Sequence, residues 1–284
     1  MISDRKGILK SINPKLFAFD LDNTLILDSK LSEENARALN AAADAGIELV
    51  VNTGRGLTGI YDDVKCIRGI KYAITSNGAC IYNLRSGEVI RRFTLSPGSV
   101  QKLMETGHSF NVTYEIFVEG HAYVSQEYYD DPARFGMPPK LVGYIQNTRQ
   151  AVPDLDEFIK QNASKIENFA YVVKDEFVHE AVRREALKQC DDIFITGSDV
   201  QWVEVMDHES GKGKGMGHLC RYLNIDIGDT VAFGDSDNDI EMLEYAGLGI
   251  CMENGTQNCK AAADAICKSC VEDGVADAIY ELIK

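Results

Sequence analysis

Short apolar runs alternate with helix-like stretches in the first third of the chain. The runs are Lys15–Asp20, Ile47–Val51 and Lys71–Thr75, and each has the length and composition of a buried strand. The stretch that begins at Ser32 carries apolar residues at helical spacing and is closed by Gly46, which predicts a helix with a serine N-cap. A second helix is expected over Gly54–Val64. Strands that alternate with helices in this way predict a parallel sheet covered on both faces.

From about residue 84 short turns separate the runs. A turn at Arg85–Glu88 divides two β-like runs, and the segments 112–118 and 121–125 predict a hairpin around Glu119 and Gly120. Helix-like stretches at 154–161 and 175–189 and a strand-like run at 168–173 follow. This texture is typical of an α+β domain, which we place at residues 84–190.

The alternating pattern then resumes. The elements expected are a glycine-punctuated run at 210–223, an apolar run at 230–235, a helix from Asp239, an apolar run at 246–252 and a helix from Asp273. The first and last thirds therefore form one domain that the middle third interrupts. The predicted fold class is α/β, a Rossmann-like parallel-sheet core of residues 1–83 and 191–284 with an α+β domain inserted at 84–190.

The charge of the chain restricts its partners. The sequence has 29 lysines and arginines against 44 aspartates and glutamates, a net charge of -15, and this field repels nucleic acid and anionic membranes. No segment approaches the ~20 apolar residues of a membrane span, and the first residues lack the apolar stretch of a signal peptide, so a cytoplasmic protein is expected. Because the field also repels phosphorylated molecules, a site for them needs its own cations.

The cysteines are scattered through the chain without a secretory signal, so we expect reduced thiols. They are Cys66, Cys80, Cys190, Cys220, Cys251, Cys259, Cys267 and Cys270. The last four resemble a zinc set only weakly, because no second C-x-x-C accompanies the pair at 267 and 270.

Polar residues follow the strands predicted in the first third, at the edge where a parallel sheet binds ligands. They are Asp20, Asp22, Thr24, Asn52, Thr53, Arg55, Ser76 and Asn77. Asp20 and Asp22 are two residues apart, so in an extended chain both side chains point the same way. Taken alone, this pair is equally typical of loop aspartates that cap a turn.

A second acidic cluster, with Asp235 and Asp239, follows a later apolar run. Carboxylates at neighbouring strand ends repel each other unless a hard divalent cation lies between them. An oxygen-only set without histidine selects magnesium. The two clusters together therefore predict a Mg²⁺ site.

Other residues are suited to an anion. Thr53 offers a hydroxyl, and Thr53, Gly54 and Arg55 offer backbone N–H groups at the start of a predicted helix, where phosphate binds favourably. Lys212 lies among glycines, which allow a close approach to phosphate. An N-cap threonine and a flexible surface lysine are the alternatives.

Four segments together resemble the haloacid dehalogenase superfamily, and within it the Cof-type phosphatases. They are FDLDNTL at 19–25, NTGR at 52–55, the lysine of SGKG at 212 and GDSDND at 234–239, which are similar to the first, second, third and fourth family motifs. The resemblance extends to 75–82, 246–256 and 271–279. Because the insertion falls between the second and third motifs, the likeness is to members with a large α+β cap there, which sets substrate choice.

The resemblance implies a phosphoric monoester hydrolase and assigns roles to individual residues. Asp20 would be the nucleophile that forms an aspartyl-phosphate, and Asp22 the general acid and base. The Mg²⁺ ligands would be Asp20, the main-chain carbonyl of Asp22, Asp235 and Asp239. Thr53, Lys212 and Asn238 would hold the phosphoryl oxygens, and Gly54, Arg55 and Asn77 complete the expected substrate site.

The chain departs from the family motifs in two places. In the third motif, Asp207–Glu209 stands where a proline and a glycine are more usual, in the loop that carries Lys212. Asn23 stands where glycine is usual. If the backbone needs a positive φ there, asparagine is the least costly substitute, so we expect the geometry to survive.

The expected partner is a small phosphorylated metabolite, with sugar phosphates foremost, and the chain is a monomer or a homodimer. Aromatic residues of the inserted domain could contact a substrate ring, but core packing is the more usual role for Tyr114, Phe117, Tyr123, Tyr128 and Tyr129. A phosphomutase with the same nucleophile stays open, as does a noncatalytic sugar-phosphate sensor, although a sensor should have lost Asp20 or Asp22. A phosphatase of phosphoproteins is disfavoured, because it needs an open site.

Overall fold

The chain forms two compact units in the computed structural model, which describes residues 2–4, 7, 12–197 and 199–284. The first unit contains the chain up to Gly54 together with Ile60–Arg91 and Gly211–Lys284, and the second contains Arg55–Gly59 and Arg92–Ser210. Residues 191–210, which we expected in the core, belong to the second unit because their strands pair with its sheet. Residues 84–91, which we expected in the inserted domain, belong to the first unit.

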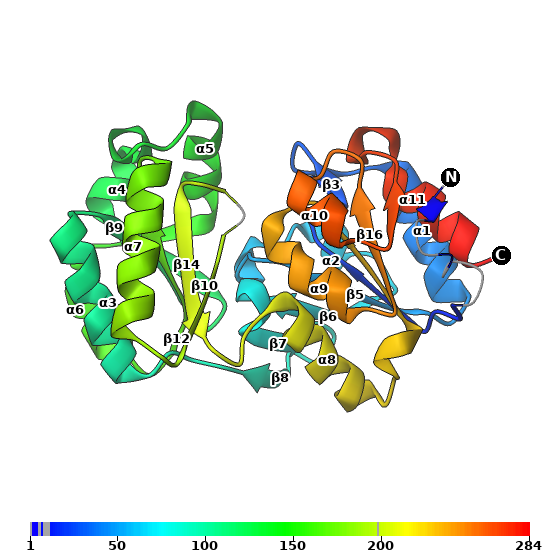
Figure 1. Cartoon of the computed structure of the whole chain (residues 1–284), viewed down its shortest axis with the longest axis horizontal. Coiled ribbons are helices and arrows are strands. Elements are labelled where there is room, and N and C mark those ends of the chain that lie inside the picture. The colour runs from blue at the N-terminus through cyan, green and yellow to red at the C-terminus, as the bar shows by residue number, and fades with distance from the viewer. Residues whose placement is uncertain (1, 5–6, 8–11, 198) are drawn as a thin grey trace. The chain divides into compact units, whose positions relative to one another are not determined.

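Among the described residues, a nine-stranded sheet forms the centre of the first unit (Figure 1). Its order is β1 (Ser3–Asp4), β17 (Ala265–Cys267), β16 (Leu248–Met252), β15 (Thr230–Gly234), β2 (Leu16–Phe19), β5 (Glu48–Asn52), β6 (Ile70–Thr75), β7 (Cys80–Asn83) and β8 (Val89–Arg92). The strands from β17 to β6 are parallel, and β1 and β7 pair antiparallel beside them. The predicted Rossmann-like parallel core is confirmed.

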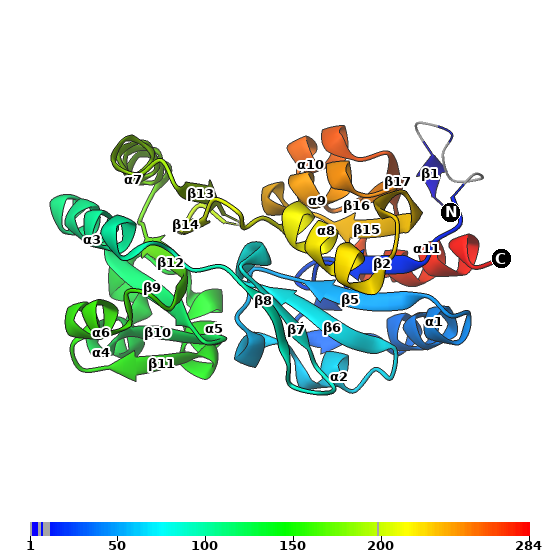
Figure 2. The same ribbon diagram turned by 90° about the horizontal axis from the view of Figure 1, so that it is seen from below.

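Helices cover both faces of this sheet (Figure 2). The helices on one face are α8 (Lys212–Leu223), α9 (Ile240–Tyr245) and α10 (Gln257–Ala262), whose apolar side chains pack against those of β2, β5 and β6. On the other face, α1 (Glu33–Asp44) and α11 (Gly274–Leu282) pack together. The side chain of Ser32 accepts the N–H of Asn35 at the start of α1, and Gly46 follows the helix with φ 87°, so both predicted ends are confirmed.

The helix expected over Gly54–Val64 is wrong. This segment contains only the 3-10 turn η1 (Leu57–Gly59) and the short helix α2 (Asp62–Lys65), apart from loops. Contacts with a residue distant in sequence prevent the helix. The backbone N–H of Thr58 donates to the carbonyl of Gly120 at 3.1 Å, and a Cβ at Gly56 would lie 2.8 Å from that oxygen. The segment therefore follows the turn of the second unit and not a helical path.

The first unit also has small connecting elements. They are the strand pair β3 (Ile26–Leu27) and β4 (Lys30–Leu31) and the 3-10 turns η2 (Ser76–Gly78), η4 (Ile227–Asp229), η5 (Asp237–Asp239) and η6 (Cys270–Glu272).

The second unit has a six-stranded sheet among its described residues. Its order is β11 (Arg149–Val152), β10 (His121–Ser125), β9 (Thr113–Val118), β12 (Ile166–Val172), β14 (Trp202–Asp207) and β13 (Ile193–Thr196), and only β10 and β11 pair parallel. The predicted hairpin between β9 and β10 is confirmed, with φ 51° at Glu119 and 81° at Gly120. The inserted domain is α+β, as expected.

Alternate residues of these strands enter two apolar cores. Residues such as Tyr114, Phe169 and Tyr171 pack with α3 (Pro97–Phe110), α6 (Leu155–Asn162) and α7 (Glu176–Gln189). Val124 and Ala170 point to the other face, where α4 (Gln126–Asp130), η3 (Pro132–Phe135) and α5 (Pro139–Thr148) cover them. Most of the aromatic residues considered for substrate contact serve this packing: Tyr114 and Tyr128 are buried in the cores, and Tyr123 packs on Phe158.

In the described part of the chain no helix has the length and apolar character needed to cross a bilayer. All eight cysteines are free thiols, as expected. Among the described residues, none of them belongs to a group that could hold a metal ion, so the zinc alternative has no structural support.

Candidate active site

Two acidic residues lie at the carboxyl ends of neighbouring strands at the centre of the first sheet. Asp20 follows β2 and Asp235 follows β15, which pair parallel, so the two strands end at the same edge. The N–H of Asp20 donates to the carbonyl of Phe233 at 2.9 Å, which continues the pairing to the site. Both carboxylates are buried, with 7% and 5% of the residue exposed.

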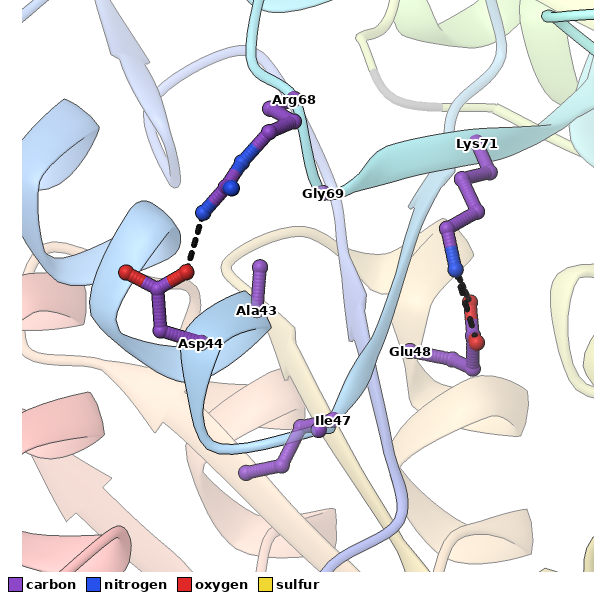
Figure 3. Close-up of a pocket in the computed structure, with 8 residues that line it drawn as sticks. Ala43, Asp44, Ile47, Glu48, Arg68, Gly69 and Lys71 are labelled. Carbon is purple, nitrogen blue, oxygen red and sulfur yellow. Dashed lines mark hydrogen bonds and ion pairs between the residues drawn. The ribbon is translucent and has the colours of Figure 1, made fainter.

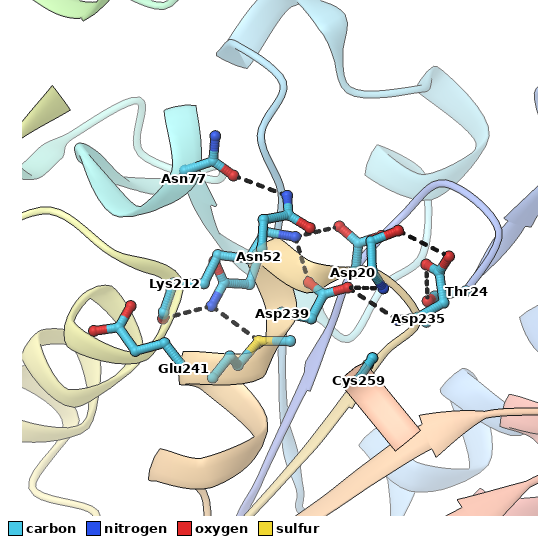
Figure 4. A network of polar contacts seen from close by, with 12 residues as sticks. Asp20, Thr24, Asn52, Asn77, Lys212, Asp235, Asp239, Glu241 and Cys259 are labelled. Carbon is cyan, nitrogen blue, oxygen red and sulfur yellow. Dashed lines mark hydrogen bonds and ion pairs between the residues drawn. The ribbon is translucent and has the colours of Figure 1, made fainter. Parts of the chain in front are cut away.

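Asp239 completes a cluster of three carboxylates. One oxygen from each of Asp20, Asp235 and Asp239 lies within 4.8 Å of the others (Figure 4). Asp239 accepts the N–H groups of Asp235 and Ser236 at 2.9 and 3.0 Å. Asp235 accepts the hydroxyls of Thr24 at 2.9 Å and Ser236 at 3.1 Å, so the positions of both carboxylates are fixed by neighbours.

Lys212, the first residue of α8, brings a cation to this cluster. Its Nζ lies 2.6 Å from Oδ1 of Asp20 and 2.5 Å from Oδ1 of Asp239, and the residue is 1% exposed. Three carboxylates and one ammonium leave two negative charges, which a divalent cation would neutralise. The all-oxygen donor set fits Mg²⁺.

The concentration of buried charge shifts the pKa values of the residues in this site. Burial raises the pKa of Asp20 well above its usual range, and the carboxylates of Asp239, Asp235 and Asp22 raise it further against the effect of Lys212. Burial and Asp239 also raise the pKa of Asp235, to about 6. Burial lowers the pKa of Lys212, but Asp20 and Asp239 outweigh it and hold the pKa above the usual value. The site therefore favours an additional cation.

Asp22 lies on the turn that follows Asp20. It is half-buried, and its Oδ1 accepts the hydroxyl of Tyr61 at 3.1 Å. Asn23 has φ 59°, the left-handed conformation expected where the family has glycine, and its carbonyl accepts Nδ2 of Asn254 at 2.9 Å. The carboxylate of Asp22 is outside the cluster of three, so its role as acid and base stays a prediction.

Three of the residues expected to bind phosphate form one buried network. The carbonyl of Thr53 accepts the N–H of Asn77 at 3.1 Å, and Oδ1 of Asn77 accepts Nδ2 of Asn238 at 3.1 Å. The carbonyl of Asn77 in turn accepts the N–H of Gly211, next to Lys212, at 3.0 Å. A Cβ at Gly54 would lie 3.1 Å from Oδ1 of Asn77. The network thus links the second, third and fourth motifs.

Ser76 and Asn77 both have φ 50°, a conformation that costs free energy for residues with a Cβ. Strained backbone of this kind persists where the surroundings hold it, and here the hydrogen bonds of Asn77 do so.

Arg55 belongs to the second unit. Its Nη1 donates to the carbonyl of Gly59 at 3.0 Å, and its guanidinium lies 4.6 Å from the ring centre of Tyr144. The guanidinium of Arg149 lies 4.7 Å from the centre of the same ring. The predicted contact of Arg55 with substrate stays a prediction.

Glu241 was not among the residues predicted from the sequence. Its Oε2 accepts the N–H of Gly213 at 3.2 Å, and burial raises its pKa while this hydrogen bond lowers it. Asn52, noted only for its place after a strand, donates Nδ2 to the carbonyl of Lys212 at 2.8 Å. No motif marks Glu241 in the sequence, because its partner lies in another helix.

A separate surface hollow lies at the amino ends of β5 and β6 (Figure 3). Its lining residues are Ala43, Asp44, Gly46, Ile47, Glu48, Arg68, Gly69 and Lys71. Lys71 pairs with Glu48 at 3.0 Å, and Arg68 pairs with Asp44. Because this hollow is at the strand ends opposite to Asp20 and its charges are paired, it takes no part in the site.

Comparison with known proteins agrees with this geometry. The family model of the haloacid dehalogenase-like hydrolases matches residues 17–279. The phosphatase YwpJ of Bacillus subtilis (strain 168) is 30% identical over 95% of this chain and 100% of its own. The 5-amino-6-(5-phospho-D-ribitylamino)uracil phosphatase YcsE of the same organism is 26% identical over 95% of this chain and 96% of its own.

A solved structure agrees as well. A haloacid dehalogenase-like hydrolase from B. subtilis superposes with a TM-score of 0.80 at 30% identity, and covers 94% of this chain and 99% of its own. With the match of the family model across both units, these likenesses show that the chain belongs to the haloacid dehalogenase-like hydrolases and is a Cof-type phosphatase among them.

Proposed function

We propose that this phosphatase hydrolyses small phosphate monoesters, foremost sugar phosphates, through an aspartyl-phosphate on Asp20. The observation that supports this most directly is the contact of Lys212 Nζ with Asp20 Oδ1 at 2.6 Å, beside two further buried carboxylates. A cation held against a nucleophile can stabilise the negative charge that a transferring phosphoryl group carries.

In the first step, a carboxylate oxygen of Asp20 attacks phosphorus, and the bond from phosphorus to the ester oxygen breaks. Asp22 gives its proton to the leaving oxygen. In the second step, Asp22 takes a proton from water, the water oxygen attacks phosphorus, and the bond to Asp20 breaks. The products are an alcohol and inorganic phosphate, and Asp20 is regenerated.

The proposed Mg²⁺ ligands are Asp20, the main-chain carbonyl of Asp22, Asp235 and Asp239. A bound Mg²⁺ supplies positive charge that keeps Asp20 ionised and offsets the charge of the phosphoryl group. Thr53, Lys212 and Asn238 hold the phosphoryl oxygens in this proposal, with Gly54, Arg55 and Asn77 around them.

The substrate class rests on the relatives and on the inserted domain. YcsE is named for a substrate whose phosphate sits on a ribityl chain, which is a sugar-derived polyol. We propose that the present chain acts on phosphates of the same chemical kind, as a monomer or a homodimer, and that the inserted domain, which we expected at 84–190 and which comprises Arg92–Ser210, acts as a cap that selects among them.

The test is phosphate release from a panel of hexose, pentose and polyol phosphates and from p-nitrophenyl phosphate, with Mg²⁺ or with EDTA. Magnesium-dependent release that Asp20→Asn abolishes is the expected result. A wild-type protein that binds sugar phosphate without releasing phosphate would refute the proposal.

A further inference from the structure

The helix that carries Lys212 begins without a capping side chain of its own. The residue before α8 is Gly211, with φ 140°, which has no side chain to accept a helix N–H. The first N–H groups of a helix have no partner within it and need an acceptor from outside. In α8 a carboxylate from a different helix accepts instead, because the N–H of Gly213 donates to Oε2 of Glu241 at 3.2 Å.

The glycines on both sides of Lys212 make room for this carboxylate. A Cβ at Gly211 would overlap Oε2 of Glu241. A Cβ at Gly213 would lie 2.7 Å from the carbonyl oxygen of Glu241 and 2.9 Å from its Cγ, closer than real Cβ contacts allow. The glycines of the SGKG segment are therefore matched to Glu241, which explains why they flank the lysine.

The main chain of Lys212 is held at a second point. Its carbonyl accepts Nδ2 of Asn52 at 2.8 Å, and Asn52 is completely buried. The side chain then reaches Asp20 and Asp239 from this fixed backbone. Glu241 and Asp239, two residues apart in sequence, thus hold the backbone and the ammonium of the α8 start respectively.

We propose that Glu241 is a positioning residue for phosphoryl transfer, which caps α8 and so fixes the Lys212 ammonium against Asp20. The inference rests on the proposed function, since it assigns Lys212 a part in the reaction. Glu241 itself touches no reacting atom. A displacement of about 1 Å at a group aligned with the reacting atoms lowers a rate by about 100-fold. Loss of the Glu241 carboxylate from the start of α8 therefore reduces turnover more than substrate affinity.

The kinetic test compares three changes at Glu241 with a matched control. Glu241→Ala removes the acceptor, and Glu241→Asp shortens the side chain by one CH₂, so that its carboxylate lies farther from the N–H of Gly213. Glu241→Gln keeps an oxygen that can accept the same N–H. Glu244, exposed on the same helix, provides the control variant Glu244→Ala.

With p-nitrophenyl phosphate and Mg²⁺, Glu241→Ala and Glu241→Asp are expected to lower kcat about 10- to 100-fold while KM changes less than about threefold. Glu241→Gln and Glu244→Ala are expected to stay within about threefold of wild type. The proposal is overturned if Glu241→Gln is as slow as Glu241→Ala, or if Glu241→Ala is no slower than Glu244→Ala. Should Glu241→Ala fail to fold, the contrast of Glu241→Asp with Glu241→Gln decides in the same way.

A second measurement separates this inference from the proposed function. Amide hydrogen exchange at Gly213 is expected to be at least about tenfold faster in Glu241→Ala than in wild type or Glu244→Ala, since an N–H without its acceptor exchanges more readily. If wild type releases no phosphate from any substrate, the proposed function has failed, while the exchange result still reports on the hydrogen bond from Gly213 to Glu241. Equal exchange at Gly213 in both alanine variants would refute the proposal that Glu241 caps α8.

Discussion

The ammonium of Lys212 lies 2.6 Å from Oδ1 of Asp20, and both side chains come from segments 192 residues apart in sequence. The same Nζ contacts Asp239, so one buried cation bridges two carboxylates. In this arrangement the lysine reduces the repulsion between the carboxylates and, in the proposed reaction, also stabilises the transferred phosphoryl group. Changes at Lys212 should therefore affect both stability and turnover.

Lys212→Met removes the ammonium and keeps most of the aliphatic volume. We expect kcat/KM to fall by about 10²- to 10³-fold, because loss of one group that stabilises transition-state charge has an effect of this size. Lys214→Met, at an exposed position on the same helix, is the control and should be close to wild type. Steady-state phosphate release checks both, and Lys212→Met activity within threefold of wild type would contradict the role.

The pKa of Asp235 predicts how stability without metal depends on pH. The pKa is raised by burial and by Asp239 from its ordinary value of 3.8 to about 6, so the folded protein holds this proton more tightly than the unfolded chain. The contribution of protonated Asp235 to the free energy of unfolding is fully present below about pH 4 and is lost as pH rises through about 6. In EDTA, we expect the free energy of unfolding to fall on the order of 3 kcal/mol more in wild type than in Asp235→Asn between about pH 4 and pH 7.

Urea unfolding at several pH values checks this difference, and Glu253→Gln, at an exposed site, controls for the loss of one acidic group. Mg²⁺ should raise the melting temperature of wild type more at about pH 7.5 than at about pH 5, since the cation competes with protons for the same carboxylates. Parallel pH curves for wild type and Asp235→Asn would argue against the raised pKa.

Two ion pairs of the second unit should differ sharply in their contribution to stability. Glu115 and Arg149 form a buried pair at 2.6 Å, with side chains 1% and 7% exposed, and Tyr128 also donates to Glu115 at 3.0 Å. Glu115→Gln leaves the guanidinium buried without a counter-charge, which should cost about 3–5 kcal/mol.

The exposed pair of Glu119 and Lys165 is the matched comparison. Its atoms are 3.4 Å apart, and the side chains are 55% and 52% exposed. Glu119→Gln should cost less than about 1 kcal/mol in the same denaturant titration, because solvent screens the pair. Equal costs for the two substitutions would show that burial does not set their strength.

The sequence predicted the parts of the site that depend on local pattern. The strand before Asp20 and the strand before Asp235 are continuous apolar runs, so their ends could be located, and parallel pairing then brings the two acids to one edge. The left-handed conformation of Asn23 also follows from local chemistry. These features need no knowledge of what packs around them.

Features that depend on tertiary packing could not be predicted from the sequence. Helix α3 was not predicted, and Gly107 within it lowers its intrinsic helix propensity. The structure explains this glycine, because a Cβ there would overlap the ring of Tyr114 on β9. The contact of Glu241 with Gly213 is missed for the same reason, since the partner lies 28 residues away in sequence.

The ring of Tyr144 lies beside two guanidinium groups of the second unit, and this arrangement gives a last prediction. Arg55 and Arg149 are 4.6 and 4.7 Å from the ring centre, and Arg149 has Glu115 as its counter-charge. A guanidinium over an aromatic face gains about 0.5–2 kcal/mol, depending on how far it is desolvated. Tyr144→Leu keeps much of the apolar volume but removes the ring, whereas Tyr144→Phe keeps the ring and removes only the hydroxyl.

We expect Tyr144→Leu to lower the free energy of unfolding by about 1–2 kcal/mol more than Tyr144→Phe, which keeps the ring and loses only the contact of the hydroxyl with Arg149. A double-mutant cycle of Tyr144→Leu with Arg55→Met isolates the contact of this pair, and a coupling above about 0.5 kcal/mol is expected for residues that touch. If the coupling is zero, Arg55 gains nothing from the ring, and the hydrogen bonds of the Thr58 N–H and hydroxyl to the carbonyl of Gly120, at 3.1 and 3.2 Å, are the contacts that hold the segment Arg55–Gly59 in this prediction. A positive coupling instead makes Tyr144 an anchor for the residue that directly follows Thr53 and Gly54, so substitutions of Tyr144 should then also raise KM for sugar phosphates.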